Sequence, residues 1–152
     1  MTRRRCVTVF SAIVLVAAAA IATAAAKPPV NVSRGQIALR GHDAVAYWTE
    51  GRPVPGSAHF EHRWNGAVWR FATTANRDAF AKDPARYAPE FGGYCAYAVS
   101  RGYTADADPS AWRIVDGRLY VNYSKRVQSL WEQDIQGNIA KARSNWPAVL
   151  DK

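Results

Sequence analysis

The chain has 152 residues, a formal net charge of +8 and only two cysteines, Cys6 and Cys95. A chain of this length forms one ordinary domain with a core of its own. Beyond the first residues the basic side chains are scattered, with no run longer than Lys125-Arg126. A nucleic-acid surface usually carries a clustered basic stripe, so we expect no nucleic-acid partner.

Residues 1–26 have the pattern of a signal peptide. Arg3-Arg4-Arg5 precedes a run of 21 uncharged residues, which ends in the small-residue pattern of a cleavage site. We therefore expect a periplasmic or secreted protein, exported by either the general secretory or the twin-arginine route. The alternative is an uncleaved anchor, because 21 uncharged residues could span a bilayer. The leader would then be the chain's one membrane contact.

Removal of this leader takes away Cys6 and three arginines. The remaining 126 residues carry 17 basic and 12 acidic side chains, a net charge of +5. Cys95 is then the one cysteine left and cannot form an internal disulfide. A packed core must therefore stabilise the fold, and six Trp, seven Tyr and five Phe are available for it.

The first half of this chain contains a short helix and a β-hairpin. Residues 27–37 are polar and contain two prolines, so we expect a flexible lead-in. Asp43 can cap a helix over residues 44–48. Asn65-Gly66 is a type I′ turn sequence between two alternating runs, and predicts a hairpin over residues 59–71. Its register places His62 opposite Trp69 and Phe60 opposite Phe71, on the buried face.

The second half contains helices around a second hairpin. Thr73 or Thr74 can cap a helix that ends before Pro84. Residues 96–99 fit either a strand or a helix, and residues 112–123 form a hairpin that turns at Asp116-Gly117. Ser124 begins a long C-terminal helix. The sequence therefore predicts an α+β fold, with a small antiparallel sheet built from two β-hairpins and helices packed on it.

Several segments, in this order and spacing, resemble the YHS-domain family. They include GHDAVAY at residues 41–47 and GGYCAY at residues 92–97, and the others lie at residues 71–73, 76–80, 83–87 and 115–123. The chain is similar to the exported, single-domain members, which mostly have no assigned function. The resemblance implies one YHS-like domain over residues 38–150. Through relatives attached to copper-transporting ATPases and oxygenases, it also implies a metal-related role.

The chain departs from the metal-linked members at their cysteines. Ala46 stands where those modules carry one cysteine, and Ala72 and Asn76 stand where they carry a pair. The resemblance therefore supports the fold, but the thiolate copper site does not carry over.

Cys95 and His62 are the candidate metal ligands, with copper or zinc as the expected ion. A thiolate and an imidazole are both suitable ligands for these ions. Cys95 could instead be a redox thiol or a small buried hydrophobic side chain. His62 could instead be a neutral imidazole that hydrogen-bonds to a neighbouring group.

Five further residues are candidates for a polar and aromatic ligand pocket. Asn76 and Arg77 lie in the first turn of their helix, and could meet two tyrosines and an aspartate near its N-terminus. The alternative is that these groups cap helices and form structural hydrogen bonds. The set is Asp43, Tyr47, Asn76, Arg77 and Tyr94.

Three functional hypotheses remain open. The first is an exported, non-catalytic YHS-type protein that binds a small ligand, a partner protein or a metal ion of the copper type. The second is a metal-free module that binds a peptide or a small ligand. The third is a thiol-dependent enzyme that uses Cys95, which would need a nearby histidine as its base.

Overall fold

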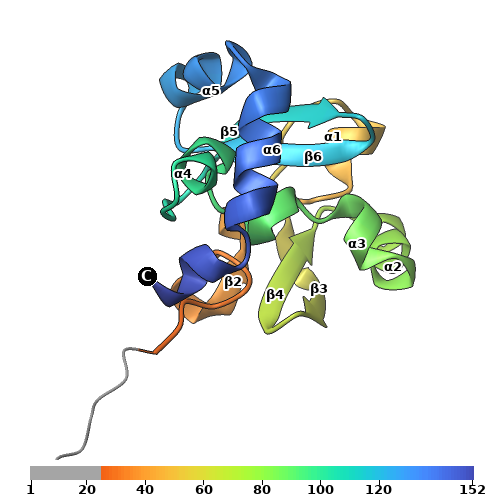
Figure 1. The fold of residues 1–152 in the computed structure, drawn as a ribbon. Helices are drawn as coiled ribbons and strands as arrows, with labels where there is room; N and C mark the ends of the chain where they lie inside the picture. The colour runs from red at the N-terminus through yellow and green to blue at the C-terminus, as the bar shows by residue number, and fades with distance from the viewer. Residues whose placement is uncertain (1–24) are drawn as a thin grey trace, which may run out of the picture.

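The computed structural model describes residues 25–152 and has an α+β fold (Figure 1). Nearly all of the expected leader lies outside this range. No described helix is long and apolar enough to cross a bilayer. The helices are α1 (Ala46–Thr49), α2 (Thr74–Lys82), α3 (Pro84–Tyr87), α4 (Ala96–Ser100), α5 (Lys125–Glu132) and α6 (Ile135–Asn145), with 3-10 turns η1 (Arg34–Gln36), η2 (Leu39–Gly41), η3 (Glu90–Gly93) and η4 (Ala148–Asp151).

The strands form two sheets instead of the single sheet expected. The first has the order β1-β2-β4-β3, and β2 runs parallel to β4 through the pair Ile37 and Val68. The second is a separate hairpin. The strands are β1 (Val32–Ser33), β2 (Ile37–Ala38), β3 (Ser57–Trp64), β4 (Ala67–Phe71), β5 (Asp108–Val115) and β6 (Arg118–Asn122).

Both predicted hairpins are present, with Asn65-Gly66 and Asp116-Gly117 in left-handed turn conformations. His62 lies opposite Trp69 as predicted. The expected pairing of Phe60 with Phe71 is wrong, because the ladder is irregular between Ser57 and Glu61 and Ser57 faces Phe71 instead. An alternating sequence pattern carries no signal for such an irregularity.

The segment expected to be a flexible lead-in is largely structured. It contains β1, η1 and the first residue of β2, and the side chain of Val30 is only 2% exposed in the core. The Asn31 N–H donates to the Gly92 carbonyl at 2.8 Å. A Cβ on Gly92 would overlap the Pro29 carbonyl oxygen. The first residues of the domain therefore pack directly on the GGYCAY segment.

The C-terminal helix is broken into two. Ser124 caps α5 as predicted, by accepting a hydrogen bond from the Val127 N–H at 3.2 Å. The chain then leaves helical geometry at Asp134, whose carboxylate accepts from the Gly137 N–H and begins α6. Figure 1 shows α6 running beside α4, and the chain end lying near the segment that begins the described domain.

Strand β6 separates two hydrophobic cores. Leu119 and Val121 point into the core that contains the first sheet, α1 and Phe80 of α2. Tyr120, between them, points into the other core, which lies under η3, α4 and α6. Alternate side chains of a strand point to opposite faces, so one short strand is shared by both cores.

Asp43 is fully buried and joins three segments. Its Oδ1 accepts from the Val45 and Ala46 N–H groups at 2.9 and 3.2 Å. The helix itself is shorter than the predicted 44–48, because α1 begins at Ala46 and its N-cap residue is Val45, not Asp43. Asp43 Oδ2 accepts from the Ala72 N–H at 2.9 Å and from Asn76 Nδ2 at 2.8 Å. One carboxylate thus ties the start of α1 to the end of β4 and the start of α2.

We expect Asp43→Asn to lower the free energy of unfolding by at least about 2 kcal/mol, because an amide cannot accept all four hydrogen bonds and buried donors would lose their partner. Glu50→Gln, at an exposed ion pair with Arg52, should change it by less than about 1 kcal/mol. Urea unfolding followed by tryptophan fluorescence gives both values. Equal costs for the two variants would contradict this role of Asp43.

Gly92→Ala and Gly51→Ala form a matched pair. Both glycines have similar positive φ values, 62° and 64°, but no atom lies within 4 Å of a Cβ built on Gly51. Gly51→Ala should cost about 1–2 kcal/mol for the left-handed backbone alone. Gly92→Ala should cost more and displace residues 29–31, which hydrogen exchange at the Asn31 amide would detect. Similar stability and exchange in the two variants would contradict the close approach.

Candidate functional site

The GGYCAY segment begins α4, so the ambiguous residues 96–99 are helical. Cys95 is the N-cap residue, and its Sγ lies 3.5 Å from the Ala98 N–H, which donates to it. The Cys95 N–H donates to the Ala105 carbonyl at 2.9 Å. The sulfur is held beneath the surface, and Cys95 is only 1% exposed.

The surroundings of the Cys95 sulfur favour a protonated thiol. Burial raises the pKa of this thiol, and the backbone N–H groups of Ala98, Tyr123 and Tyr97 oppose that rise. The thiol lies 3.7 Å from Asn122 Oδ1 and donates to it, and the same oxygen accepts from the Tyr97 N–H at 3.1 Å. The sulfur thus has the partners of a buried structural thiol.

The structure does not bring Cys95 and His62 together. His62 lies half-buried on β3, with its ring 6.1 Å from the ring of Phe80. Cys95 lies between α4 and β6, beside the other core. Within residues 25–152, no three His, Cys, Asp or Glu side chains gather in a group that could hold a metal ion.

Of the five residues expected to form a polar pocket, only Asp43 and Asn76 hydrogen-bond to each other. Tyr47 is buried and donates its hydroxyl proton to the Pro109 carbonyl at 2.8 Å, and burial raises its pKa. Arg77 pairs with its neighbour Asp78 at the surface. Tyr94 donates to the Pro28 carbonyl at 2.9 Å. Each of the five side chains thus has a hydrogen-bond or ion-pair partner within the described domain.

A different pocket lies over Cys95. Its volume is about 270 Å³, and its walls are mostly apolar and aromatic. Tyr103 and Tyr123 on its rim are 52% and 58% exposed, more than any other large hydrophobic side chain of the described residues. We call it the tyrosine pocket. It is lined by Cys95, Tyr97, Ala98, Tyr103, Ala105, Tyr123 and Val127.

Sequence reasoning missed all of this lining except Cys95. Tyr97 and Tyr103 lie in and just after α4, whereas Tyr123 follows β6, and no periodicity links the three. The one available signal was the number of tyrosines on either side of Cys95. Their meeting depends on the loop after α4, which the Cys95–Ala105 hydrogen bond holds against the GGYCAY segment.

Arg101 contacts Tyr97, one of the residues that line the tyrosine pocket. Its guanidinium lies over the Tyr97 ring at 4.8 Å, and its Nη2 donates to the Tyr97 hydroxyl at 2.9 Å. The hydroxyl oxygen is therefore engaged as an acceptor while its own proton remains available to a ligand. This pair of side chains can recognise an acceptor oxygen or an anionic group.

Comparisons of the chain with family models, with curated proteins and with solved structures gave no significant match. The function is therefore argued from the geometry of the site.

The raised pKa of Cys95 predicts a loss of stability at alkaline pH. The unfolded thiol ionises near its ordinary pKa of about 8.5, whereas the folded thiol keeps its proton to higher pH. Its contribution to folding is therefore complete below about pH 8 and falls as the pH rises further. Cys95→Ala should lack this loss.

The measurement is urea unfolding of the wild type and Cys95→Ala at several pH values between about 7 and about 10. The difference between the two proteins isolates Cys95, because the buried tyrosines titrate in both. A constant difference across this range would contradict a buried, protonated thiol.

Proposed function

We propose that this domain is a non-catalytic, metal-free binding module, and that it holds a small aromatic ligand in the tyrosine pocket. The observation that carries the proposal is the pair of exposed tyrosines, Tyr103 and Tyr123, at the rim of an apolar pocket. Exposed aromatic side chains around a concave apolar surface are typical of ligand sites.

The size and chemistry of the pocket support a ligand of one or two rings. A volume of about 270 Å³ is close to the lower end of the range for small-molecule sites, which begins at roughly 300 Å³. Tyrosine rings contact aromatic ligands by offset or edge-to-face stacking. The Tyr97 hydroxyl and Arg101 favour a ligand with a carboxylate or another acceptor oxygen at its edge.

The contacts of Cys95 favour binding over catalysis. A catalytic thiol needs a base within hydrogen-bond reach and a lowered pKa. The pKa of Cys95 is raised instead, and its hydrogen bonds are to Ala98 and Asn122. In this proposal, Cys95 forms the floor of the pocket.

We also propose that this is an exported domain of the YHS type, on the basis of the sequence resemblance and the leader pattern. Three backbone and side-chain positions support the family assignment. Ala46, Ala72 and Asn76, which stand where the metal-linked members carry cysteines, all hydrogen-bond to the carboxylate of Asp43. Positions that share a metal site in relatives would lie close together in this way.

We expect benzoate to bind more tightly than cyclohexanecarboxylate, which has the same charge and nearly the same size but no aromatic ring. Tyr123→Ala should weaken benzoate binding about tenfold, or ~1.4 kcal/mol, because it removes one stacking face. Isothermal titration calorimetry or ligand-observed NMR measures these affinities. The residue is exposed, so the change should leave the fold intact.

Leu130→Ala is the matched control, since Leu130 is an exposed apolar residue of α5 outside the pocket. It should leave benzoate affinity unchanged, and so should an excess of a metal chelator. Equal affinity for the two carboxylates, or an unchanged affinity in Tyr123→Ala, would overturn the proposal.

A further inference from the structure

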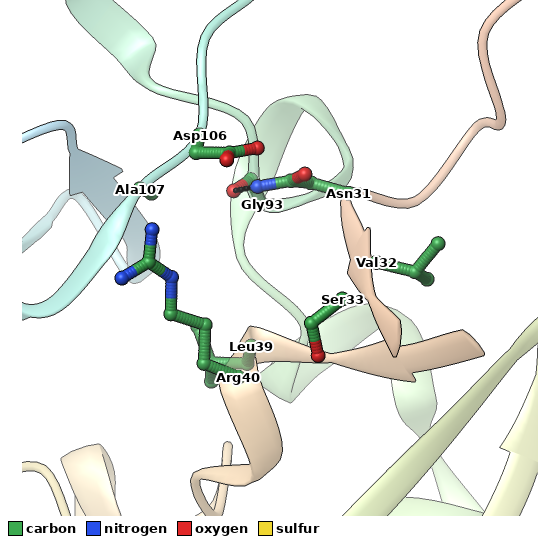
Figure 2. A pocket seen from close by; sticks show the side chains of 8 residues that line it. All are labelled: Asn31, Val32, Ser33, Leu39, Arg40, Gly93, Asp106 and Ala107. Atoms are coloured by element: carbon green, nitrogen blue, oxygen red, sulfur yellow. Dashed lines mark hydrogen bonds between the residues drawn. The ribbon is translucent and has the colours of Figure 1, made fainter. Parts of the chain in front are cut away.

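A second, polar pocket lies on the other side of the GGYCAY segment. Gly93 and Ala107 line this pocket, whereas Cys95 and Ala105 line the tyrosine pocket. Figure 2 shows the side chains around the second pocket, which we call the polar pocket. Its lining is Asn31, Val32, Ser33, Leu39, Arg40, Gly93, Asp106 and Ala107.

Two opposite charges border the polar pocket without pairing. Arg40 extends from the η2 side toward Ala107 and Asp106, as Figure 2 shows. Within residues 25–152, neither Arg40 nor Asp106 forms an ion pair. The charge of Arg40 also helps to lower the pKa of Asp108, although the main cause is the hydrogen bond that Asp108 Oδ1 accepts from the Ser110 N–H at 2.8 Å. Among the described residues, Arg40 and Asp106 thus border the same small space without an ion pair between them.

Backbone strain is concentrated around this pocket. Six described residues other than glycine have positive φ, and two of them, Asn65 and Asp116, are explained by their hairpin turns. Leu39 and Arg40, with φ values of 50° and 49°, line the pocket itself. The remaining two, Gln36 and Phe91, lie in the segments that lead to lining residues. These four residues lie in the 3-10 turns η1, η2 and η3, and residues held in such uncommon backbone conformations are often found at functional sites.

The pocket is also fixed by hydrogen bonds between its walls. Asn31 Nδ2 donates to the Gly93 carbonyl at 3.3 Å, and the Asn31 N–H donates to the Gly92 carbonyl. Ser33 Oγ donates to the Ile37 carbonyl at 3.2 Å. The Asn31 amide nitrogen and the Ser33 hydroxyl are thus occupied, and Arg40 and Asp106 are the charged side chains of the lining.

We propose that the polar pocket binds the head group of a free α-amino acid, with the carboxylate on Arg40 and the ammonium on Asp106. Arg forms bidentate hydrogen bonds with carboxylates, and a carboxylate accepts well from an ammonium. The volume is about 40 Å³, so the pocket takes only a small polar group.

The charge balance distinguishes this ligand from simpler ions. A plain anion would be repelled by Asp106 and a plain cation by Arg40, whereas a zwitterion meets one favourable charge at each end. Both side chains are exposed, so solvent screens each contact and the affinity should be weak. The proposal does not depend on the tyrosine pocket, because the two sites share no lining residue.

The test is a titration of the ¹⁵N-labelled protein with glycine, N-acetylglycine and glycinamide. Glycine has both charges, N-acetylglycine lacks the ammonium and glycinamide lacks the carboxylate. Glycine should cause saturable shifts at the Asn31, Gly93 and Ala107 amides. Each of the other two should bind at least about tenfold more weakly.

Two variants complete the experiment. Arg40→Gln and Asp106→Asn should each weaken glycine binding at least about tenfold, while Arg34→Gln, an exposed residue of η1 outside the pocket, should not. Equal binding of N-acetylglycine would indicate a simple anion site, and equal binding of glycinamide a simple cation site. Either result, or the absence of saturable shifts with glycine, overturns the proposal even if a variant fails to fold.

Discussion

The hydrogen bonds to the buried Asp43 carboxylate hold the first half of the domain together. Its two oxygens accept from four N–H groups that belong to α1, the end of β4 and α2. A buried carboxylate is tolerated only where hydrogen bonds replace its hydration. All three segments must therefore reach their positions together. Asp43 and Asn76 were expected to form part of a ligand site. Their hydrogen bond to each other instead stabilises the fold.

In the second half of the domain, one backbone hydrogen bond joins the GGYCAY segment to the loop after α4. The Cys95 N–H donates to the Ala105 carbonyl, and the two segments on either side of this bond form a wall with a pocket on each face. One pocket is apolar and rich in tyrosine, and the other is bordered by Arg40 and Asp106, which form no ion pair within residues 25–152. The wall has little freedom, because Gly92 is in close contact with Pro29 and Tyr120 of β6 packs in the core beneath η3. A rigid support of this kind favours binding sites on its surface.

Local signals in the sequence predict the elements well, and long-range contacts less well. Asn65-Gly66 fixed the pairing of His62 with Trp69 because a two-residue turn determines the register next to it. That influence ended at the irregularity near Ser57, which no local pattern marks. Val30 shows the same limit: its burial depends on the close approach of Pro29 to Gly92, 63 positions later in the chain. The tyrosine pocket was missed for this reason, since its walls come from three separate segments.

The surroundings of Cys95 distinguish a structural thiol from a metal-binding or catalytic one, a distinction that the sequence alone does not make. A metal or catalytic thiol needs partners that lower its pKa, and a structural thiol needs partners that satisfy it while protonated. Asn122 Oδ1 accepts from both the thiol and the Tyr97 N–H, so one buried side chain fixes the sulfur and the start of α4 together. The ring of His62 lies against Phe80, which belongs to the other hydrophobic core. At Ala46, Ala72 and Asn76, where metal-linked members of the family that we propose carry thiols, this chain has N–H donors that converge on the Asp43 carboxylate. The polar centre around Asp43 therefore stabilises the fold, and the two binding sites that we propose lie on either side of the GGYCAY segment.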